Sequence, residues 1–592
     1  MIAIKISRKL DDFHASEERM GHNSCLQLAR RAIGESPIAM SPPRRRNTTA
    51  VAVAATLIAT VFALPARAHQ PALWPWPQQI YISGNTVPVD AAKFEVECEI
   101  DNPCPTKFQN ELQYYADLVR HSCSNSVYPK ANNNDNGEAS SSSSSSSTSW
   151  DQDGQKIDSC VVKLATSDDA LAIDSNQTFR LTVSSDPYPN CLVEADNMYG
   201  AYYGLVTLSQ LCDTSNTTSP SILEARIRDE PRFAFRGFLL DTARHFLPVS
   251  YIKRVLDVLA LHRYNVLHWH VVDSESFPLQ SQAFPDLAEK GAFSPDAVYK
   301  TEDLADVVQY ASRRGITVMP EFDVPGHGSW GKGYPSLMGC KDVLDPTNPE
   351  VYTFLLTFLK EMLEIFPSEY IFLGGDEVDT SCWLKNPKIA EWLQQHDMTD
   401  AELFDYFWQN VTSEVIPGLE GRKVGVWQSN KLDIKPTLLP EGSFGNVWQD
   451  PKMMGPVIDG GMPVVLSGTY YLDQDNSATA AGPCKAYAWQ QTWKCMYQEE
   501  PFDQLTQEQW SSLIGLETTM WGEGVNRFDF EARVWAKAAA VAERMWSNQN
   551  VNDVAEAQVR LDRHICRLNL MGVHAGPIIP GFCSSDVDGE AW

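Results

Sequence analysis

The segment "YIFLGGDEVDTSCW", Tyr370 to Trp383, places an apolar run directly before two adjacent carboxylates, Asp376 and Glu377. An isolated Asp-Glu pair usually lies in a solvated turn, because charged side chains are rarely buried. Here the pair follows a short apolar run of the kind that forms a buried strand. The segment therefore predicts a strand that ends at two acids, and the rest of the chain indicates which fold contains it.

Seven further apolar runs have the same character. In chain order the eight runs are 236–241, 265–272, 316–323, 370–377, 423–428, 443–449, 463–468 and 515–523. Between the first two, Ile252, Val255, Leu256 and Leu259 recur at helical spacing, and Ser250 is a plausible N-cap for that helix.

Amphipathic helices are also predicted before the third and fourth runs, at 302–315 and 351–366. Parallel strands that are buried on both faces read as continuous apolar runs, and eight of them with intervening helices indicate a (β/α)8 TIM barrel. We expect this α/β barrel to extend from about residue 232 to residue 550, with weaker helical signals in its second half.

The chain before the barrel predicts a small α+β domain over residues 69–228. Alternating segments at 93–100 and 179–183 indicate strands, and residues 198–211 indicate a helix. A Ser-rich insert at 132–150 is typical of a flexible or O-glycosylated surface loop. We expect three parts in all: a leader over 1–68, this domain, and the catalytic barrel with a C-terminal extension over 229–592.

Residues 1–68 contain the features of a secretory signal. A basic segment at 42–49 precedes an apolar run over 50–68, which ends in an A-x-A-like site at Ala66-Arg67-Ala68. The run is short for a membrane span, which leaves an uncleaved anchor as the alternative. We expect Met40 to be the true start, and the secretory pathway, leading outside the cell or to a lysosome or vacuole, to be the destination.

Cysteine usage indicates the same compartment. Thirteen cysteines less Cys25 in the leader leave twelve, an even set suited to disulfides, and metal binding is the weaker alternative because paired C-x-x-C motifs are absent. Spacing predicts that Cys484 pairs with Cys495 and Cys566 with Cys583. Sequons predict N-glycans, at Asn176, Asn216 and Asn410.

Charge and composition restrict the ligand class. A net charge of −28 repels phosphate backbones and anionic lipid, so nucleic acid is excluded as an expected partner. The 17 tryptophans either belong to the core or hold sugars on their ring faces.

The ends of the eight predicted strands carry a distinctive set of side chains. TIM barrels place their chemistry at these ends, whereas each residue alone would usually be a core ring or a solvated charge. The set comprises Asp241, Arg244, Asp273, Asp323, His327, Asp376, Glu377, Trp427, Trp448, Tyr471, Asp473, Trp521 and Glu523. Carboxylates among indoles predict a pocket for a neutral, polyhydroxylated ligand, and the acidic pair suggests cleavage of a glycosidic bond.

The adjacency of Asp376 and Glu377 favours one mechanism over another. Retaining glycosidases ordinarily place two carboxyls on opposite sides of the scissile bond, which neighbours on one strand cannot easily do. The alternative is a substrate that supplies its own nucleophile, the oxygen of a 2-acetamido group. One carboxylate then orients that amide and the other protonates the leaving oxygen.

At this point the chain resembles the family 20 glycoside hydrolases, the β-N-acetylhexosaminidases, in their eukaryotic two-domain form. The resemblance covers residues 73 to 583 and rests on motifs that occur in the family's order: "RGFLLDTARHFLP", "HWHVVDSESFP", "EFDVPGHGSWG", "LGGDEVDTSCW", "MWGEG" and "AAAVAERMWS". It implies release of terminal β-linked N-acetylglucosamine or N-acetylgalactosamine, with retention through an oxazolinium intermediate. It also implies a disulfide between Cys340 and Cys382, a possible homodimer, and neither metal nor organic cofactor.

The resemblance assigns a role to each candidate residue. Asp376 would orient the acetamido group, Glu377 would be the general acid and then the base, and Tyr471 would hydrogen-bond the acetamido carbonyl. The remaining roles are a pocket wall of Trp427, Trp448 and Trp521, contacts to the outer hydroxyls from Arg244 and Glu523, a relay of His327 and Asp323, and contacts to the sugar from Asp273 and Asp473. Because the general acid must be protonated, we expect an acidic to near-neutral pH optimum.

Two positions qualify the resemblance. The family usually has two acids in its second motif, where this chain has Asp273 followed by Ser274, so the hydrogen bonding at that edge is open. Asp473 stands where some relatives that accept 6-sulfated sugars have a neutral residue, which predicts a preference for neutral sugars. The competing hypotheses are a sugar-binding protein that has lost catalysis and a two-carboxylate β-glycosidase that does not need the acetamide.

Overall fold

The computed structural model describes residues 71–99, 104–124, 156–213, 220–428, 434–474 and 488–583. Several predicted features lie outside these ranges: the leader with Met40, the Ser-rich insert, Asn216 and Cys484. Within the described ranges, no helix combines the length and the apolar character that a membrane crossing requires.

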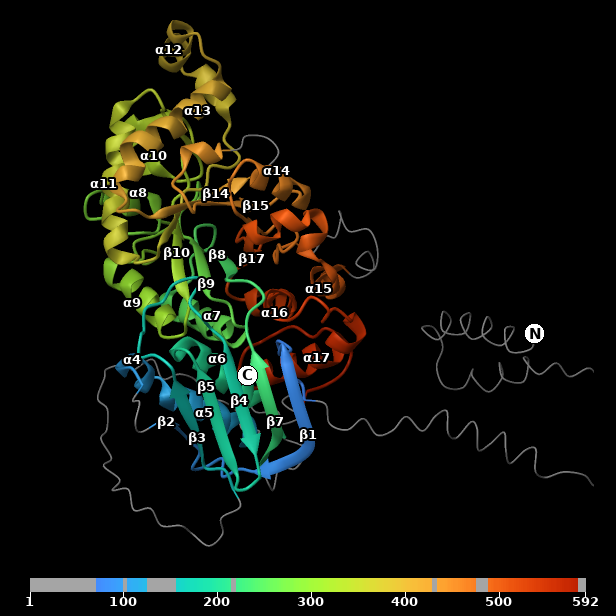
Figure 1. The fold of residues 1–592 in the computed structure, drawn as a ribbon. Helices are drawn as coiled ribbons and strands as arrows, with labels where there is room; N and C mark the ends of the chain where they lie inside the picture. Colours follow the sequence, from blue (N-terminus) through green and yellow to red (C-terminus); the bar gives the residue numbers. More distant parts are fainter. Residues whose placement is uncertain are drawn as a thin grey trace, which may run out of the picture. The chain divides into compact units, whose positions relative to one another are not determined.

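The N-terminal domain is a mixed sheet with helices packed on it (Figure 1). The strands follow the order β1-β7-β4-β5-β3-β2, with β6 beside β7. Their bounds are β1 Gln79–Pro88, β2 Glu95–Cys98, β3 Ser159–Leu164, β4 Phe179–Ser184, β5 Asn190–Ala195, β6 Cys212–Asp213 and β7 Ser221–Asp229. The helices are α4 Thr106–Gln109, α5 Leu112–Ser124 and α6 Met198–Gln210. Helix α6 begins after Asn197, whose side chain accepts hydrogen bonds from the main-chain N–H groups of Tyr199 and Gly200.

Eight parallel strands close into the predicted barrel, which confirms the fold class. In chain order they are β8 Phe235–Asp241, β9 Val266–His270, β10 Thr317–Glu321, β13 Tyr370–Phe372, β14 Lys423–Gln428, β15 Phe444–Val447, β16 Val464–Leu466 and β17 Leu513–Met520. Between β10 and β13 a small hairpin is formed by β11 Met338–Cys340 and β12 Val343–Leu344.

Long helices also occur in the second half of the barrel, where the sequence signals were weaker. The barrel helices are α7 Val249–Leu261, α8 Asp286–Gly291, α9 Thr301–Ser312, α10 Trp330–Gly333, α11 Pro349–Ile365, α12 Pro387–His396, α13 Asp400–Asn410, α14 Met454–Asp459, α15 Ala488–Gln498, α16 Phe530–Trp546 and α17 Val554–Leu570. The predicted N-cap of α7 is wrong: Pro248 occupies that position in an extended conformation, and Ser250 lies within the first turn.

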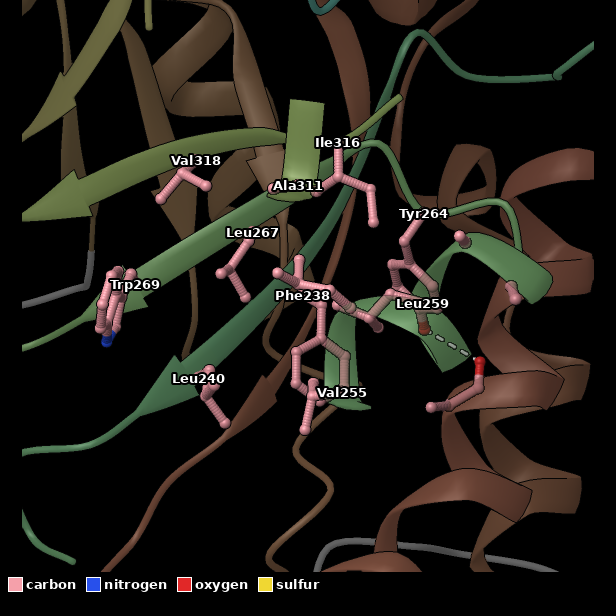
Figure 2. Close-up of a cluster of buried hydrophobic side chains, with 14 of the residues drawn as sticks. Phe238, Leu240, Val255, Leu259, Tyr264, Leu267, Trp269, Ala311, Ile316 and Val318 are labelled. Carbon is pink, nitrogen blue, oxygen red and sulfur yellow. Dashed lines mark hydrogen bonds between the residues drawn. The ribbon is translucent and has the colours of Figure 1, made fainter. Parts of the chain in front are cut away.

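Side chains alternate between the helix layer and the lumen along each barrel strand. Figure 2 shows the outward set, in which Phe238 and Leu240 of β8 and Leu267 of β9 pack near Val255 and Leu259 of α7. Each of these side chains is at most 1 % exposed, and burial of one such side chain stabilises the fold by roughly 1.5–3 kcal/mol.

The lumen contains a second, separate apolar cluster, which reaches a cavity of the barrel through Trp427. Its members are Ile173, Phe235, Leu239, Val266, Met319, Tyr370, Phe372, Trp427, Phe444 and Val465. Ile173 belongs to the N-terminal domain, and its carbonyl oxygen accepts a hydrogen bond of 2.9 Å from the Asn265 side chain at the start of β9. The N-terminal domain therefore contributes directly to the filling of the barrel.

Disulfides join elements in both domains. The predicted pair Cys566–Cys583 and the pair Cys340–Cys382 implied by the resemblance are both confirmed. Three further bonds join Cys98 to Cys104, Cys123 to Cys212, and Cys160 to Cys191. Such bonds form in oxidising compartments, which indicates the secretory pathway. The pairing of Cys484 with Cys495 stays a prediction.

The described sequons differ in accessibility. Asn176 is exposed, and its side chain donates to Asp196. Asn410 is half-buried at the end of α13, where its amide donates to the main-chain oxygen of Tyr406 at 3.0 Å and to the Tyr352 hydroxyl at 3.3 Å. Glycosylation at either position stays a prediction.

A buried ion pair connects the last strand of the N-terminal domain to the barrel. Asp229 at the end of β7 lies 2.5 Å from Arg263, and both side chains are 0 % exposed. Arg263 also donates to the Thr207 hydroxyl of α6 at 2.7 Å and stacks 4.4 Å above the Trp546 ring. The positive charge of Arg263 is thus compensated by the single carboxylate of Asp229, within a closely packed junction.

We expect Asp229→Asn to lower the free energy of unfolding by about 3–5 kcal/mol, because it leaves Arg263 buried without a counter-charge. Urea denaturation of the purified protein, followed by intrinsic fluorescence, measures this loss. Glu99→Gln, which removes one partner of an exposed ion pair with Lys163, is the matched control and should change stability by less than about 1 kcal/mol. Equal effects of the two substitutions would contradict the prediction.

Candidate active site

A cavity of about 390 Å³ opens at the carboxyl-terminal ends of the barrel strands. The structure brings together around it all twelve side chains to which the sequence assigned a role: Arg244, Asp273, Asp323, His327, Asp376, Glu377, Trp427, Trp448, Tyr471, Asp473, Trp521 and Glu523. Five further residues complete the lining: His270, Gln474, Gly524, Val525 and Arg533. The volume suits a small ligand such as one sugar unit.

The strand that leads to Asp376 and Glu377 ends earlier than the sequence predicted. Strand β13 stops at Phe372, and Gly374 and Gly375 then adopt φ values of +65° and +94°. A Cβ atom on Gly374 would lie 1.9 Å from a carboxylate oxygen of Asp323, so only glycine fits there. Asp376 and Glu377 therefore project from a tight turn instead of from a strand.

Left-handed backbone conformations recur at the cavity. Glu377 has φ +51° and His327 has φ +48°, although neither is glycine. Such conformations cost free energy and persist where the surrounding structure imposes them, often at functional sites. The strained residues here are two of the side chains that line the cavity.

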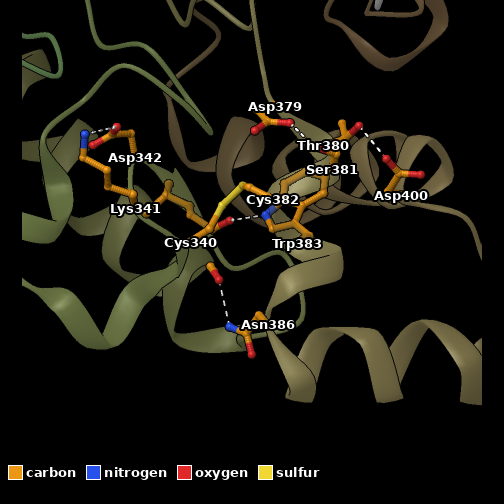
Figure 3. Close-up of a disulfide and its surroundings, with 12 residues drawn as sticks. Cys340, Lys341, Asp342, Asp379, Thr380, Ser381, Cys382, Trp383, Asn386 and Asp400 are labelled. Carbon is orange, nitrogen blue, oxygen red and sulfur yellow. Dashed lines mark hydrogen bonds and ion pairs between the residues drawn. A yellow bond between two sulfur atoms is a disulfide. The ribbon is translucent and has the colours of Figure 1, made fainter.

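The Cys340–Cys382 disulfide stabilises the loop that follows this turn. It connects strand β11 to the segment after Glu377, and Figure 3 shows the polar contacts around it. The Trp383 indole donates to the carbonyl of Leu344 at 3.0 Å, and the Asn386 amide donates to the carbonyl of Gly339 at 2.8 Å. The two loops that carry His327 and Asp376 are thereby linked on their outer side.

Asp323, His327 and Asp376 form a compact cluster of titratable side chains. His327 Nδ1 lies 3.0 Å from Asp323 Oδ2 and 3.9 Å from Asp376 Oδ1. Burial would lower the pKa of His327, but the hydrogen bond and charge of Asp323, with Asp376 and Asp273 nearby, outweigh it and raise that pKa to about 10. The imidazole is therefore cationic at neutral pH.

The same cluster alters both carboxyl groups. Burial, followed by the charge of Asp323, raises the pKa of Asp376 well above its usual range, while the charge of His327 opposes the rise. Burial also raises the pKa of Asp323, and its hydrogen bond with His327 opposes this. The potential ligand atoms of the three residues lie within 4.8 Å of one another.

Three buried polar atoms of the lining have no hydrogen-bond partner among the described residues. They are Asp376 Oδ1, Trp448 Nε1 and Asp473 Oδ1. Buried polar groups are nearly always paired, and an unpaired one demands a functional explanation. Two acceptors and one donor are thus available for the polar groups of a ligand.

Aromatic rings enclose the cavity on several sides. Trp427 and Trp521 have ring centroids 5.9 Å apart, and the Arg244 guanidinium lies 5.3 Å from the Trp521 ring. Tyr471 pairs through its backbone with Thr519 of β17, and burial raises the pKa of its phenol well above its usual range. Tyr471 is therefore an O–H donor at every physiological pH.

Arg244 is the centre of an acidic group that includes one residue the sequence analysis missed. Its guanidinium lies 3.1 Å from Asp241, 2.8 Å from Asp273, 3.0 Å from Glu275 and 3.8 Å from Glu523. Glu275 directly follows Ser274, the position at which the family usually has a second acid. Glu275 therefore adds a further carboxylate to those around Arg244.

Comparisons with known proteins agree with this geometry. The profile described as "Glycosyl hydrolase family 20, catalytic domain" matches residues 233–549, and the profile "beta-acetyl hexosaminidase like" matches residues 73–211. The chain belongs to glycosyl hydrolase family 20. As a family 20 enzyme it is a glycoside hydrolase of the β-hexosaminidase type, as the resemblance implied.

Individual relatives cover most of the family 20 chain. The β-hexosaminidase subunit beta of Homo sapiens is 39% identical over 70% of this chain and 74% of its own length. The β-hexosaminidase subunit A1 of Dictyostelium discoideum is 33% identical over 87% and 91%, respectively. Among solved structures, the chitobiase of Flavobacterium johnsoniae aligns with a TM-score of 0.69 and 26% identity over 85% of this chain and 74% of that one.

The residues that the sequence analysis did not assign to the site include His270, which lines the cavity, and Glu275, which contacts Arg244 from outside the lining. His270 alternates with His268 along β9, so both point into the lumen, and the i, i+2 spacing was a signal that packing could equally explain. Glu275 had no such signal, because an acid in a loop after a strand is usually solvated. Its role depends on the position of Arg244, which comes from a different strand.

We expect His327→Asn to move the acid limb of the kcat/KM profile of the enzyme to higher pH. The cationic imidazole stabilises the Asp376 carboxylate, so its removal raises the pKa of Asp376 further, by about 1–3 units for an opposite charge at this distance. A pH-rate profile on an N-acetyl-β-glucosaminide measures the shift. His396→Asn, at an exposed histidine on α12, is the control and should leave the profile unchanged. An unchanged acid limb in His327→Asn would contradict the stabilisation of the Asp376 carboxylate by His327.

Proposed function

We propose that this chain is an exo-acting β-N-acetylhexosaminidase that retains configuration by substrate-assisted catalysis. It removes terminal, non-reducing β-linked N-acetylglucosamine or N-acetylgalactosamine. The observation that carries the proposal is the unpaired, buried Asp376 Oδ1 beside the aromatic wall, because an acetamido N–H is the donor that it lacks. The names of the relatives, β-hexosaminidase and chitobiase, support the same substrate class.

The first step in this proposal is attack by the substrate's own acetamido oxygen on the anomeric carbon. The Asp376 carboxylate accepts the amide N–H and balances the positive charge of the oxazolinium ring, while the Tyr471 hydroxyl donates to the acetamido oxygen. Glu377, which is exposed at the cavity, protonates the leaving oxygen. In the second step Glu377 takes a proton from water, which opens the ring with net retention.

The outer part of the sugar is assigned to the acidic side of the cavity. Arg244, oriented by Asp273 and Glu275, donates to the outer hydroxyls, and Glu523 and Asp473 accept from them. Trp448 and Trp521 cover the apolar faces of the ring. The cavity lined by these residues accommodates one sugar unit, which is consistent with cleavage at the end of a sugar chain.

The alternative function is a sugar-binding protein on the same scaffold with impaired catalysis. It would use the same tryptophans and would not need the strained turn or the charged cluster around Asp376. The presence of Asp376, Glu377, His327 and Asp323 around one cavity favours the enzyme.

We expect Glu377→Gln and Asp376→Asn to reduce kcat/KM on 4-nitrophenyl N-acetyl-β-glucosaminide by about 10²–10⁴-fold each. The parent should cleave this substrate and leave the corresponding β-glucoside nearly untouched, because the glucoside has no acetamide. Glu377→Gln should lose more activity on chitobiose than on the nitrophenyl substrate, whose leaving group needs less protonation.

Glu302→Gln, at an exposed acid on α9, is the matched control and should retain parental activity. A folded parent without activity would favour the sugar-binding alternative. Equal cleavage of the glucoside would instead favour an ordinary two-carboxylate glycosidase.

Asp473 should confer a selectivity that varies with pH. Burial, reinforced by the charge of Glu523, raises the pKa of Asp473 to about 6. Above that pH the carboxylate repels a 6-sulfate on the sugar, and below it the neutral acid does so less. The ratio of kcat/KM for plain over 6-sulfated 4-nitrophenyl N-acetyl-β-glucosaminide should therefore be larger at pH 7.5 than at pH 4.5.

Asp473→Asn is the control for this selectivity, because it keeps the shape of the side chain and removes its titration. The variant should show a smaller ratio with little dependence on pH. Equal turnover of both substrates by the parent at pH 7.5 would contradict the prediction.

The proposal extends to assembly and location. Several relatives are named as subunits, which supports assembly into an oligomer, and a homodimer is the assembly that we propose. Sedimentation of the purified protein measures its mass directly. The disulfides indicate the secretory pathway, and delivery outside the cell or to a lysosome or vacuole is the finer proposal.

A further inference from the structure

A row of alternating charges crosses the barrel lumen beneath the cavity. Its members, in spatial order, are Glu517, His268, Glu321, His270, Asp273 and Arg244. The first five residues are each at most 1 % exposed. Buried charges of this kind require partners of opposite sign, and each member here has at least one.

Glu321 at the end of β10 is the member with contacts to two separate walls of the cavity. Its Oε1 accepts a hydrogen bond of 2.7 Å from the indole N–H of Trp427. Its Oε2 contacts His270 Nδ1 and lies 3.2 Å from His268 Nε2. Trp427 and His270 line the cavity and Glu321 does not, so Glu321 holds two lining residues without contacting a ligand itself.

The contact with His270 continues to the residues assigned to the outer hydroxyls. His270 Nε2 lies 2.8 Å from Asp273 Oδ2, and the same oxygen lies 2.8 Å from the Arg244 guanidinium. The His270 ring also packs edge-on against Trp521 at 4.9 Å. One carboxylate is therefore the common anchor of Trp427 on one side and of His270, Asp273 and Arg244 on the other.

The charge states favour this arrangement. Burial opposes ionisation of Glu321, but the positive charges of His270 and His268 outweigh it and hold the pKa of Glu321 below its usual range. Burial likewise opposes protonation of His270, and Glu321 and Asp273 outweigh it and raise the pKa of His270 well above its usual range. The anchor is thus an ionised carboxylate bound to a cationic imidazole and to an indole N–H.

We propose that Glu321 is a positioning residue of the sugar subsite, which fixes the Trp427 indole and the His270–Asp273–Arg244 arm relative to each other. What the subsite holds rests on the proposed function, whereas the anchoring itself rests on the contacts of Glu321. The side chain at position 321 touches no ligand atom. If it accepts only one of the two hydrogen bonds, either the Trp427 indole or His270 is no longer held in place.

Glu321→Gln in the full chain tests this, because glutamine keeps the size of the side chain but replaces one of its two acceptor oxygens with an amide N–H₂ donor. The remaining carbonyl oxygen should stay on the cationic His270, the stronger donor, so that the amide faces the Trp427 indole N–H, which then loses its acceptor. We expect kcat/KM on 4-nitrophenyl N-acetyl-β-glucosaminide to fall about 10–100-fold, as for loss of a hydrogen bond to a charged group. Weaker inhibition by N-acetylglucosamine should accompany it. Trp427→Phe, which keeps an aromatic ring without the N–H, should lower kcat/KM about tenfold.

A double variant and a matched control separate anchoring from general destabilisation. Combined with Glu321→Gln, the Trp427→Phe change should cost less than about threefold more, because both remove the same hydrogen bond. Glu517→Gln makes the identical change in an equally buried carboxylate, whose partners His268 and Asn446 do not line the cavity. It should remain within about threefold of the parent while the thermal midpoint falls in both variants.

The proposal is overturned if Glu321→Gln stays within threefold of the parent, if Glu517→Gln loses as much activity, or if the double variant shows fully additive losses. If Glu321→Gln does not fold, Trp427→Phe becomes the deciding variant. A parental kcat/KM in Trp427→Phe would then contradict the proposed positioning role of Glu321. A folded parent that cleaves no acetamido sugar contradicts the proposed function instead, and the two failures are thereby distinct.

Discussion

The carboxylate of Asp323 is the contact on which the rest of the candidate site depends. One oxygen accepts the main-chain N–H of Gly375 at 2.7 Å, and the other lies 3.0 Å from His327 Nδ1. The main-chain oxygen of Asp323 also accepts a hydrogen bond of 3.2 Å from the Trp330 indole N–H. A buried carboxylate requires such donors, so the conformation of two loops and the charge of His327 follow from one constraint.

Charge compensation inside the barrel follows the same logic. The chain is strongly acidic overall, with a net charge of −28, and yet its lumen contains cationic imidazoles and a guanidinium between carboxylates. The alternation lets acidic side chains remain ionised at depth, where an isolated acid would take up a proton. Asp376 departs from this pattern, because burial and the negative charge of Asp323 outweigh the positive charge of His327 there, and one of its oxygens is left unpaired. That departure marks the position at which a ligand is expected to complete the site.

Much of the architecture was predictable from local patterns. Buried parallel strands read as apolar runs, and the rule that barrel chemistry lies at strand ends selected thirteen side chains, of which the structure places all but Asp241 around one cavity. Local patterns were less reliable at element ends. The first helix of the barrel begins after Pro248 instead of Ser250, and β13 ends at Phe372, before the glycines. Those boundaries depend on contacts with distant residues such as Asp323.

The sequence by itself determined the fold class, the family and the identity of the side chains at the barrel rim, because periodicity and motif order are local properties of the chain. Tertiary structure alone decided that Glu275 contacts Arg244, and that Glu321 bridges Trp427 and His270. These roles depend on distances between side chains from different strands. Hydrogen bonds and charges act over a few ångströms in space, and positions along a sequence do not encode those distances directly.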